Sequence, residues 1–201
     1  MNDKFFNLKR EKQDRFINAA LKIFAENGYH KASTDDIVRE AGISKGLLFH
    51  YFGSKQGLYE FVYNYSTRVL MMEYTDHVPL FQEDFFELQK QMETAKRNVM
   101  ISYPYMNVFV NQAFREESRE VLEVVADSMD RYSAGLAQVY GKADISRFKD
   151  SVDPSAVLKM CLFMADGVLN EQFKNGKISP ESYYEEIISY LELLKANLYK
   201  S

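Results

Sequence analysis

The chain has 201 residues, of which 46% are hydrophobic and 27% charged, with nine Gly, four Pro and a formal net charge of -4. This composition excludes wholesale disorder, and the scarcity of Gly and Pro argues against a many-stranded sandwich or barrel. The single Cys excludes an internal disulfide and an all-Cys zinc site. No apolar run is long enough to cross a membrane, so we expect a cytoplasmic protein that makes no membrane contact.

Helical periodicity predicts an all-α fold of about nine helices and no strand. The first expected helix covers residues 8–27 and stops at Gly28, and two short ones follow, capped by Ser33 and Ser44. A longer helix starts at Ser54. The remaining expected helices cover about 81–101, 104–114, 116–140, 154–174 and 180–199, with a loop at 141–152. Pro104 is expected at the first position of its helix.

Charge is unevenly distributed along the chain. Residues 1–60 carry ten basic and eight acidic side chains, a surplus of +2, whereas the remaining 141 residues net -6. The asymmetry suggests two functional parts, although chance variation of the surface would give a difference of this size. The acidic total therefore does not by itself exclude a nucleic-acid partner.

Residues 33–53, STDDIVREAGISKGLLFHYFG, have the pattern of a helix-turn-helix unit with Gly42 at the joint. In such units the N-terminal end of the second helix approaches the bases of the major groove. Here that end is Ser44-Lys45-Gly46-Leu47, in which Lys45 can neutralise a phosphate and Gly46 allows close approach. Two short helices around a Gly turn also occur in helical proteins that bind no DNA.

The run from residue 19 to residue 62 resembles the DNA-binding domain of the tetracycline-repressor (TetR) family. The matching positions are Phe24-(x)3-Gly28-Tyr29, then Thr34-(x)2-Ile37-(x)3-Ala41-Gly42-Ile43-Ser44-Lys45-Gly46, and His50-Tyr51-Phe52-(x)-Ser54-Lys55-(x)2-Leu58. The resemblance implies a DNA-binding domain over residues 1–54 and a helical ligand-sensing and dimerisation domain over residues 55–201.

The resemblance also implies which residues touch DNA. They are Thr34, Ser44, Lys45, Gly46, Leu47, Phe49, His50, Tyr51 and Lys55. Tyr51 and Lys55 would hold phosphates, and Lys45 and Gly46 would lie nearest the base edges. Leu47 and Phe49 depart from the residues usual in the family. Leu47 could pack on a thymine methyl or belong to the core, Phe49 cannot donate to a phosphate, and His50 is either a phosphate donor or an ordinary surface residue.

Large soft side chains in the second part fit either a packed bundle or an apolar pocket between helices. The resemblance favours a pocket for a small apolar or aromatic effector, with Asp127, Asp130 and Asp166 as candidate polar partners. The expected pocket residues are Met100, Tyr103, Met106, Phe109, Tyr132, Phe163 and Met164.

Family members dimerise through their last two helices, so the resemblance implies a homodimer. The interface residues expected are Val157, Leu158, Cys161, Leu162, Ala165, Leu169, Tyr184, Ile187, Ile188 and Leu191. The implied function is a ligand-responsive regulator, most often a repressor, that binds a palindromic operator in double-stranded DNA and is released by the effector.

Two other classes of protein fit the sequence less well. An enzyme would be expected to carry a motif such as HExxH, a P-loop or GxGxxG, and the chain has none of these three. A structural helical adaptor would not need Ser44-Lys45-Gly46 beside Tyr51 and Lys55. His30 and His77 have no partners at metal-ligand spacing, so neither a metal nor a cofactor is expected.

Overall fold

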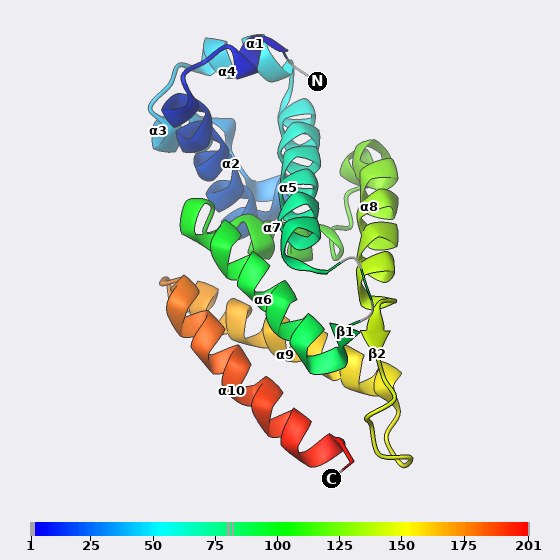
Figure 1. Ribbon diagram of the computed structural model, residues 1–201. Coiled ribbons are helices and arrows are strands. Elements are labelled where there is room, and N and C mark those ends of the chain that lie inside the picture. The colour runs from blue at the N-terminus through cyan, green and yellow to red at the C-terminus, as the bar shows by residue number, and fades with distance from the viewer. Residues whose placement is uncertain (1–2, 80, 82, 201) are drawn as a thin grey trace. The chain divides into compact units, whose positions relative to one another are not determined.

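The computed structural model describes residues 3–79, 81 and 83–200, and it confirms the predicted all-α fold class (Figure 1). Over these residues the helices are α1 (Asp3–Phe6), α2 (Arg10–Lys31), α3 (Thr34–Ala41), α4 (Lys45–Phe52), α5 (Lys55–His77), α6 (Phe85–Ser102), α7 (Met106–Ala113), α8 (Arg119–Tyr140), α9 (Pro154–Lys174) and α10 (Pro180–Leu198). Two short strands, β1 (Glu83–Asp84) and β2 (Ala143–Asp144), pair in parallel.

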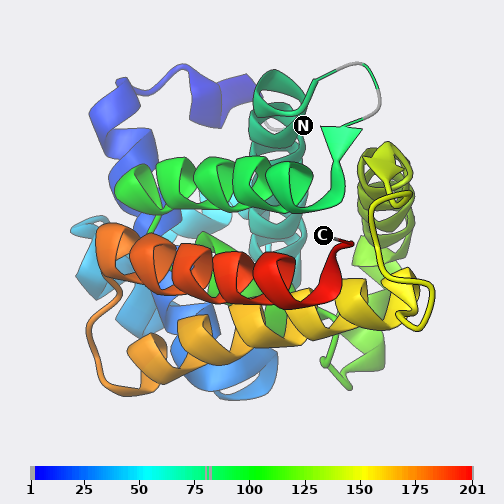
Figure 2. The same cartoon turned by 60° about the horizontal axis from the view of Figure 1, so that its bottom comes forward.

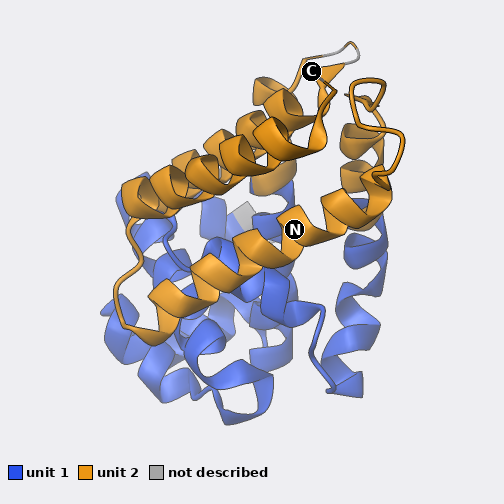
Figure 3. Cartoon of the chain, turned by 90° about the horizontal axis from the view of Figure 1, so that it is seen from below, with its two compact units in different colours: residues 1–69, 102–132 blue, residues 70–101, 133–201 orange. Residues whose placement is uncertain are grey.

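The chain divides into two compact units, coloured separately in Figure 3. Unit 1 contains Met1–Val69 and Ser102–Tyr132, and unit 2 contains Leu70–Ile101 and Ser133–Ser201. Helices α5 and α8 each contribute residues to both units. The helix-turn-helix segment therefore shares a compact unit with α7 and with the first halves of α5 and α8, which lie beyond the domain boundary expected at residue 54.

Unit 1 is organised around α2, which packs against α3 and α7. Its inward face carries Phe16, Ala20 and Phe24, each at most 2% exposed, at the spacing of an amphipathic helix. The straight part of α2 is interrupted at Gly28, whose φ of 66° and ψ of 176° suit glycine alone. The helical run resumes after this break and continues to Lys31, four residues beyond the expected end at residue 27.

In unit 2, α6, α9 and α10 lie side by side (Figure 2). The Lys195 ammonium on α10 donates to the Glu87 carboxylate on α6 over 2.6 Å, and Lys90 on α6 pairs with Glu192 on α10. Phe148, from the segment expected to be a loop, is buried at 4% exposure. Its ring meets those of Phe85, Phe86 and Tyr199.

Several helices begin later than the periodicity predicts, because local capping overrides it. Helix α6 starts at Phe85, where the Asp84 carboxylate accepts the N–H groups of Phe86 and Glu87. Helix α8 starts at Arg119 rather than Glu116. Pro104 lies in the turn before α7 instead of at its first position. By contrast, α9 begins at Pro154 as expected.

Candidate nucleic-acid interface

Helices α3 and α4 form the two-helix unit, and each begins with a serine cap. The Ser33 hydroxyl accepts the Asp35 N–H at 3.1 Å, and the Ser44 hydroxyl accepts the Leu47 N–H at 3.2 Å. Between them Gly42 ends α3 in the left-handed conformation, with φ 64° and ψ 40°. Caps and turn together set the direction of α4.

Buried side chains hold the two helices to the rest of unit 1. Ile37 and Ala41 on α3 and Leu48 on α4 are all 0% exposed. Leu48 is the residue of α4 that packs in the core, whereas its neighbour Leu47 is half-buried. This anchoring leaves the other side of α4 to solvent.

The expected DNA-contacting residues divide by exposure. The exposed ones are Ser44, Lys45, Gly46, Phe49 and His50, and the half-buried ones are Thr34, Leu47, Tyr51 and Lys55. A Cβ added at Gly46 would meet nothing within 4 Å, so nothing inside the described chain requires glycine there. The first turn of α4 is thus an open surface.

Lys45 is not a solitary cation on this surface. Its Nζ lies 2.8 Å from Oδ1 and 2.9 Å from Oδ2 of Asp35, in the first turn of α3. The two side chains are 51% and 65% exposed. The ion pair therefore bridges the N-terminal ends of both helices at the surface expected to face DNA.

Lys55 occupies a different setting from the one expected of a phosphate ligand. Its ammonium donates to the carbonyl oxygens of Tyr29, Ala32 and His30 at 2.8, 3.2 and 3.3 Å. The same nitrogen lies 4.5 Å from the centroid of the Tyr29 ring. An ammonium has three protons, so these contacts engage all of them and tie the start of α5 to the end of α2.

The broken end of α2 is also held by the start of α8. The Tyr29 N–H donates to Glu116 at 3.3 Å, and the Tyr29 hydroxyl donates to Glu120 at 2.7 Å. Gln56 donates to the Glu120 carbonyl oxygen at 2.7 Å. Burial and the hydrogen bond to Glu120 raise the pKa of the Tyr29 hydroxyl, which therefore remains a donor at neutral pH.

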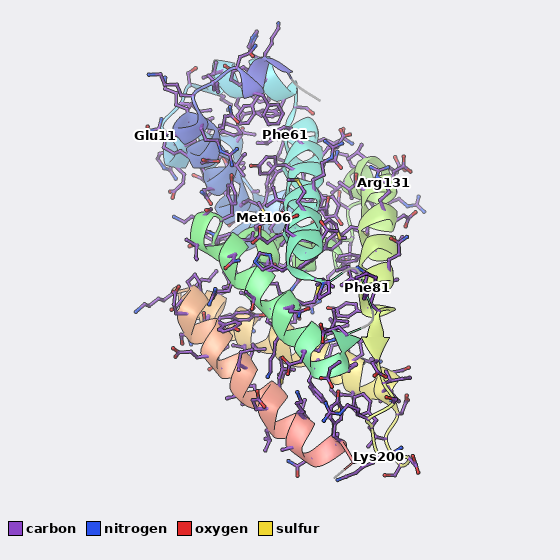
Figure 4. All side chains as sticks on the ribbon, viewed as in Figure 1. Glu11, Phe61, Phe81, Met106, Arg131 and Lys200 are labelled. Atoms are coloured by element: carbon purple, nitrogen blue, oxygen red, sulfur yellow. The ribbon has the colours of Figure 1, made fainter. Side chains whose placement is uncertain are left out.

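Sequence reasoning missed helix α1 and its aromatic cluster. The Phe5 ring is 0% exposed, and its centroid lies 5.1 to 5.7 Å from the rings of Phe16, Tyr51, Phe52 and Phe61. Figure 4 labels Phe61 on the first half of α5. Phe5 thus fixes the C-terminal end of α4, including Tyr51. The available signal was the apolar pair at residues 5 and 6, which precedes the long helical pattern.

The seven expected pocket residues fall into both units. Tyr103, Met106, Phe109 and Tyr132 are buried in unit 1, whereas Met100 is buried in unit 2. The other two, Phe163 and Met164, lie on α9 in unit 2, and Phe163 is 66% exposed.

Two of the pocket residues in unit 1 have defined contacts. The Phe109 ring lies among those of Phe24, Tyr59 and Tyr63. The Tyr103 hydroxyl is shared by Asp14, Arg10 and Tyr65 and is part-buried.

The ten expected interface residues also divide by exposure. Six are buried within the single chain, namely Val157, Cys161, Ala165, Leu169, Ile187 and Leu191. Leu158, Tyr184 and Ile188 are half-buried, and Leu162 is 39% exposed. The most exposed apolar side chains of α9 and α10 are others: Met160 at 54%, Phe163 at 66% and Leu193 at 63%. Periodicity identified both helices but not their outward faces.

Among the described residues, no cluster of three His, Cys, Asp or Glu side chains could hold a metal ion. None of the helices in the described part of the chain has the length and apolarity that a membrane span requires.

The comparisons with known proteins agree with this geometry. Residues 16–62 match the family model of bacterial regulatory proteins, tetR family. The HTH-type negative transcriptional regulator IcaR of the biofilm operon icaADBC, from Staphylococcus aureus, is 22% identical over 188 residues, spanning 90% of this chain and 97% of IcaR. The HTH-type transcriptional regulator YuxN of Bacillus subtilis is 27% identical over 142 residues, 66% of this chain but only 47% of YuxN, so the chain spans about half the length of that relative.

Among solved structures, the transcriptional regulator FadR from Bacillus subtilis in complex with stearoyl-CoA matches with a TM-score of 0.61 at 16% identity, covering 92% of this chain and 98% of that one. The fold and the α3–α4 unit define a helix-turn-helix transcription regulator, not an enzyme. Residues 16–62 carry the DNA-binding domain of the tetR family of such regulators.

Proposed function

We propose that the chain is a ligand-responsive repressor that binds a palindromic operator as a homodimer, reading DNA through residues 1–54 and sensing an effector through residues 55–201. The observation that carries the proposal is the exposed first turn of α4, with Ser44, Lys45 and Gly46 open to solvent beside the half-buried Tyr51. The similarity to IcaR, which is a negative regulator, favours repression.

The experiment for DNA binding is a gel shift with the chromosomal region upstream of the chain's own gene. The double variant Lys45→Ala and Tyr51→Ala should lose the shift, because it removes both the ammonium of α4 and the hydroxyl expected to bind a phosphate. The matched control is Lys31→Ala, an exposed lysine at the end of α2. Circular dichroism and the unfolding midpoint establish that each variant is folded. Equal binding by the double variant and the wild type would refute the assignment of α4 as the reading helix.

The dimer is expected to use the outward faces of α9 and α10. Met160 and Phe163 on α9 and Leu193 on α10 are more than half exposed. Exposed apolar side chains do not stabilise a single chain in water, and several of them together mark a surface for association. Gly167 on α9 is also exposed, and a Cβ there would meet nothing within 4 Å, so the backbone of a second chain could approach closely. A two-fold dimer would place two reading helices about 34 Å apart, one turn of B-DNA.

Sedimentation equilibrium tests this interface. Phe163→Glu should shift the chain from dimer to monomer and abolish the gel shift, because a charge in an apolar contact costs several kcal/mol unless it is paired. The control is Lys177→Glu, a charge change at an exposed lysine between α9 and α10. A Phe163→Glu chain that stays dimeric would refute this face as the interface.

For the effector we expect a small apolar or aromatic molecule bound near the buried side chains of unit 1. Two buried polar atoms there, the Tyr63 hydroxyl oxygen and the Asn107 side-chain nitrogen, have no hydrogen-bond partner among the described residues. Such groups are uncommon and could receive the polar part of a ligand. The FadR structure holds stearoyl-CoA, so stearoyl-CoA is a rational first probe.

The effector releases DNA only to the extent that it binds the released conformation better than the bound one. Titration of the protein–DNA complex with stearoyl-CoA and with small aromatic compounds measures that preference directly. Tyr63→Phe should weaken the response and leave DNA binding without effector unchanged. An unaltered response would exclude the Tyr63 hydroxyl as an effector contact.

A further inference from the structure

The ion pair between Lys45 and Asp35 needs an explanation, because a carboxylate opposes the attraction that brings a reader to phosphates. Lys45 is the only lysine or arginine of α4. Its charge is compensated by Asp35 at 2.8 Å, on the surface where a free cation would contribute most. The pair is more than half exposed on both sides, so it gains little stability for the folded chain.

The neighbouring acid, Asp36, does not reach the reading helix α4. Asp36 pairs with Arg39 on its own helix, one turn away, and leaves Lys45 untouched. Asp35 instead reaches across from α3 to the first turn of α4, where base edges are read. The two acids thus stand side by side in sequence, but only one adds an acceptor to the reading surface.

The pair presents a donor and an acceptor at a spacing that matches one base pair. In the major groove a G·C pair shows the O6 acceptor of guanine next to the N4 amino donor of cytosine. These two atoms hydrogen-bond to each other and are therefore about 2.9 Å apart. Lys45 Nζ and Asp35 Oδ1 are 2.8 Å apart with the complementary polarity.

An A·T pair also offers an acceptor beside a donor, but it fits less well. Guanine carries a second acceptor, N7, next to O6, whereas thymine O4 is flanked by a methyl group. The Lys45 ammonium has three protons, of which the two carboxylate oxygens of Asp35 engage two, and the third can point between O6 and N7. The charged pair therefore favours G·C over A·T.

Resting on the proposed operator binding, we propose that Asp35 is a specificity-determining residue, which with Lys45 reads one G·C pair in each half-site. Asp35 accepts from the cytosine N4 amino group while Lys45 donates to the guanine. The carboxylate weakens attraction to phosphates in general and contributes discrimination at one position instead.

The experiment selects bound sequences from a pool of duplexes with two randomised half-sites, using the wild type, Asp35→Asn and Asp36→Asn. Wild type and Asp36→Asn should enrich the same palindrome. Asp35→Asn should lose the G·C preference at one symmetric position, by about fivefold or more per half-site, and drift toward A·T there, since Asn suits adenine. Lys45→Met should lose guanine at that same position, which provides an independent test should Asp35→Asn fold poorly.

The outcomes separate the two proposals. If Asp35→Asn enriches an unchanged motif, whether at equal affinity or at uniformly higher affinity for every sequence, the inference is overturned. Asp35 would then at most weaken the attraction to phosphates without contributing to sequence specificity. A wild-type chain that enriches no motif overturns operator binding itself, and the specificity role with it, before any variant is compared.

Discussion

Replacing Lys55 by Met tests whether this residue stabilises the fold of unit 1, by joining the start of α5 to the end of α2, or binds a DNA phosphate. Methionine keeps an unbranched stem of similar length and removes only the ammonium. In the folded chain that group donates to the carbonyl oxygens of Tyr29, Ala32 and His30. The substitution therefore leaves three acceptors at the end of α2 without their common donor.

The expected loss of stability follows from these hydrogen bonds. The bond to Tyr29 at 2.8 Å is a charge-assisted hydrogen bond, which contributes about 1.5–3 kcal/mol, whereas those at 3.2 and 3.3 Å are weaker. The cation over the Tyr29 ring at 4.5 Å adds about 0.5–1 kcal/mol. Desolvation of the half-buried ammonium offsets part of the sum, so we expect Lys55→Met to lower the free energy of unfolding by about 2–3 kcal/mol.

Urea denaturation and the salt dependence of DNA binding together decide the question. The structural role predicts a lower unfolding midpoint, with the slope of log affinity against log salt nearly unchanged while the variant is folded. A phosphate-binding role predicts the reverse: an unchanged midpoint, and a slope smaller by about 0.9 for each phosphate that the variant no longer neutralises, or nearly two for a dimer. Lys31→Met, the same change at an exposed lysine of α2, should alter the stability by less than about 0.5 kcal/mol. An unchanged midpoint for Lys55→Met would refute the structural role.

Three further outcomes are expected. Phe5→Ala should cost about 3–5 kcal/mol in urea denaturation, because it empties a fully buried ring site next to α4; a loss below about 1 kcal/mol would mean that α1 is not docked in solution. Burial raises the pKa of the Cys161 thiol to about 12, so an alkylating reagent at pH 8 should modify it only after unfolding, and rapid labelling of the native chain would contradict its buried position. The hydrogen bond from Lys195 lowers the pKa of the Glu87 carboxyl, so the stability that this pair supplies is present at neutral pH and is lost as pH falls below the ordinary carboxyl range. Glu87→Gln should lower the free energy of unfolding measured in urea at pH 7, by less than about 1 kcal/mol for this partly exposed pair, and leave it unchanged at pH 3. An equal difference at both pH values would exclude the electrostatic cause.

The parts of the fold that the sequence predicts well are those with local stop and start signals. Asp153-Pro154 and Ser179-Pro180 place the starts of α9 and α10 correctly, because each cap accepts a hydrogen bond from its own first turn. Helix α1 escapes prediction because four residues carry no period, and the burial of Phe5 depends on rings distant in sequence. The two-residue strands leave no periodic signal either.

The candidate pocket and interface residues are harder to separate, for a reason visible in α9. This helix carries apolar residues on two faces: Val157 and Cys161 are buried, whereas Met160 and Phe163 are exposed. Periodicity identifies an apolar helix, but it cannot say which face meets the same chain and which meets another. The sequence therefore places Phe163 in the pocket, although its exposure makes it the better candidate for the dimer contact.

The charge surplus of the first sixty residues contributes less in the folded chain than in the sequence. Arg10, Lys22, Arg39 and Lys45 each pair with an acid of the same unit, and Lys55 is engaged by backbone carbonyls. Each phosphate contact made by such a cation replaces an existing partner, so its net gain is smaller than that of a free cation. A single reader built this way gains modest affinity from electrostatics. In the proposed homodimer, tight operator binding would depend on two α3–α4 units acting together, and base-edge contacts such as the one we infer for Asp35 would carry a larger share of the specificity.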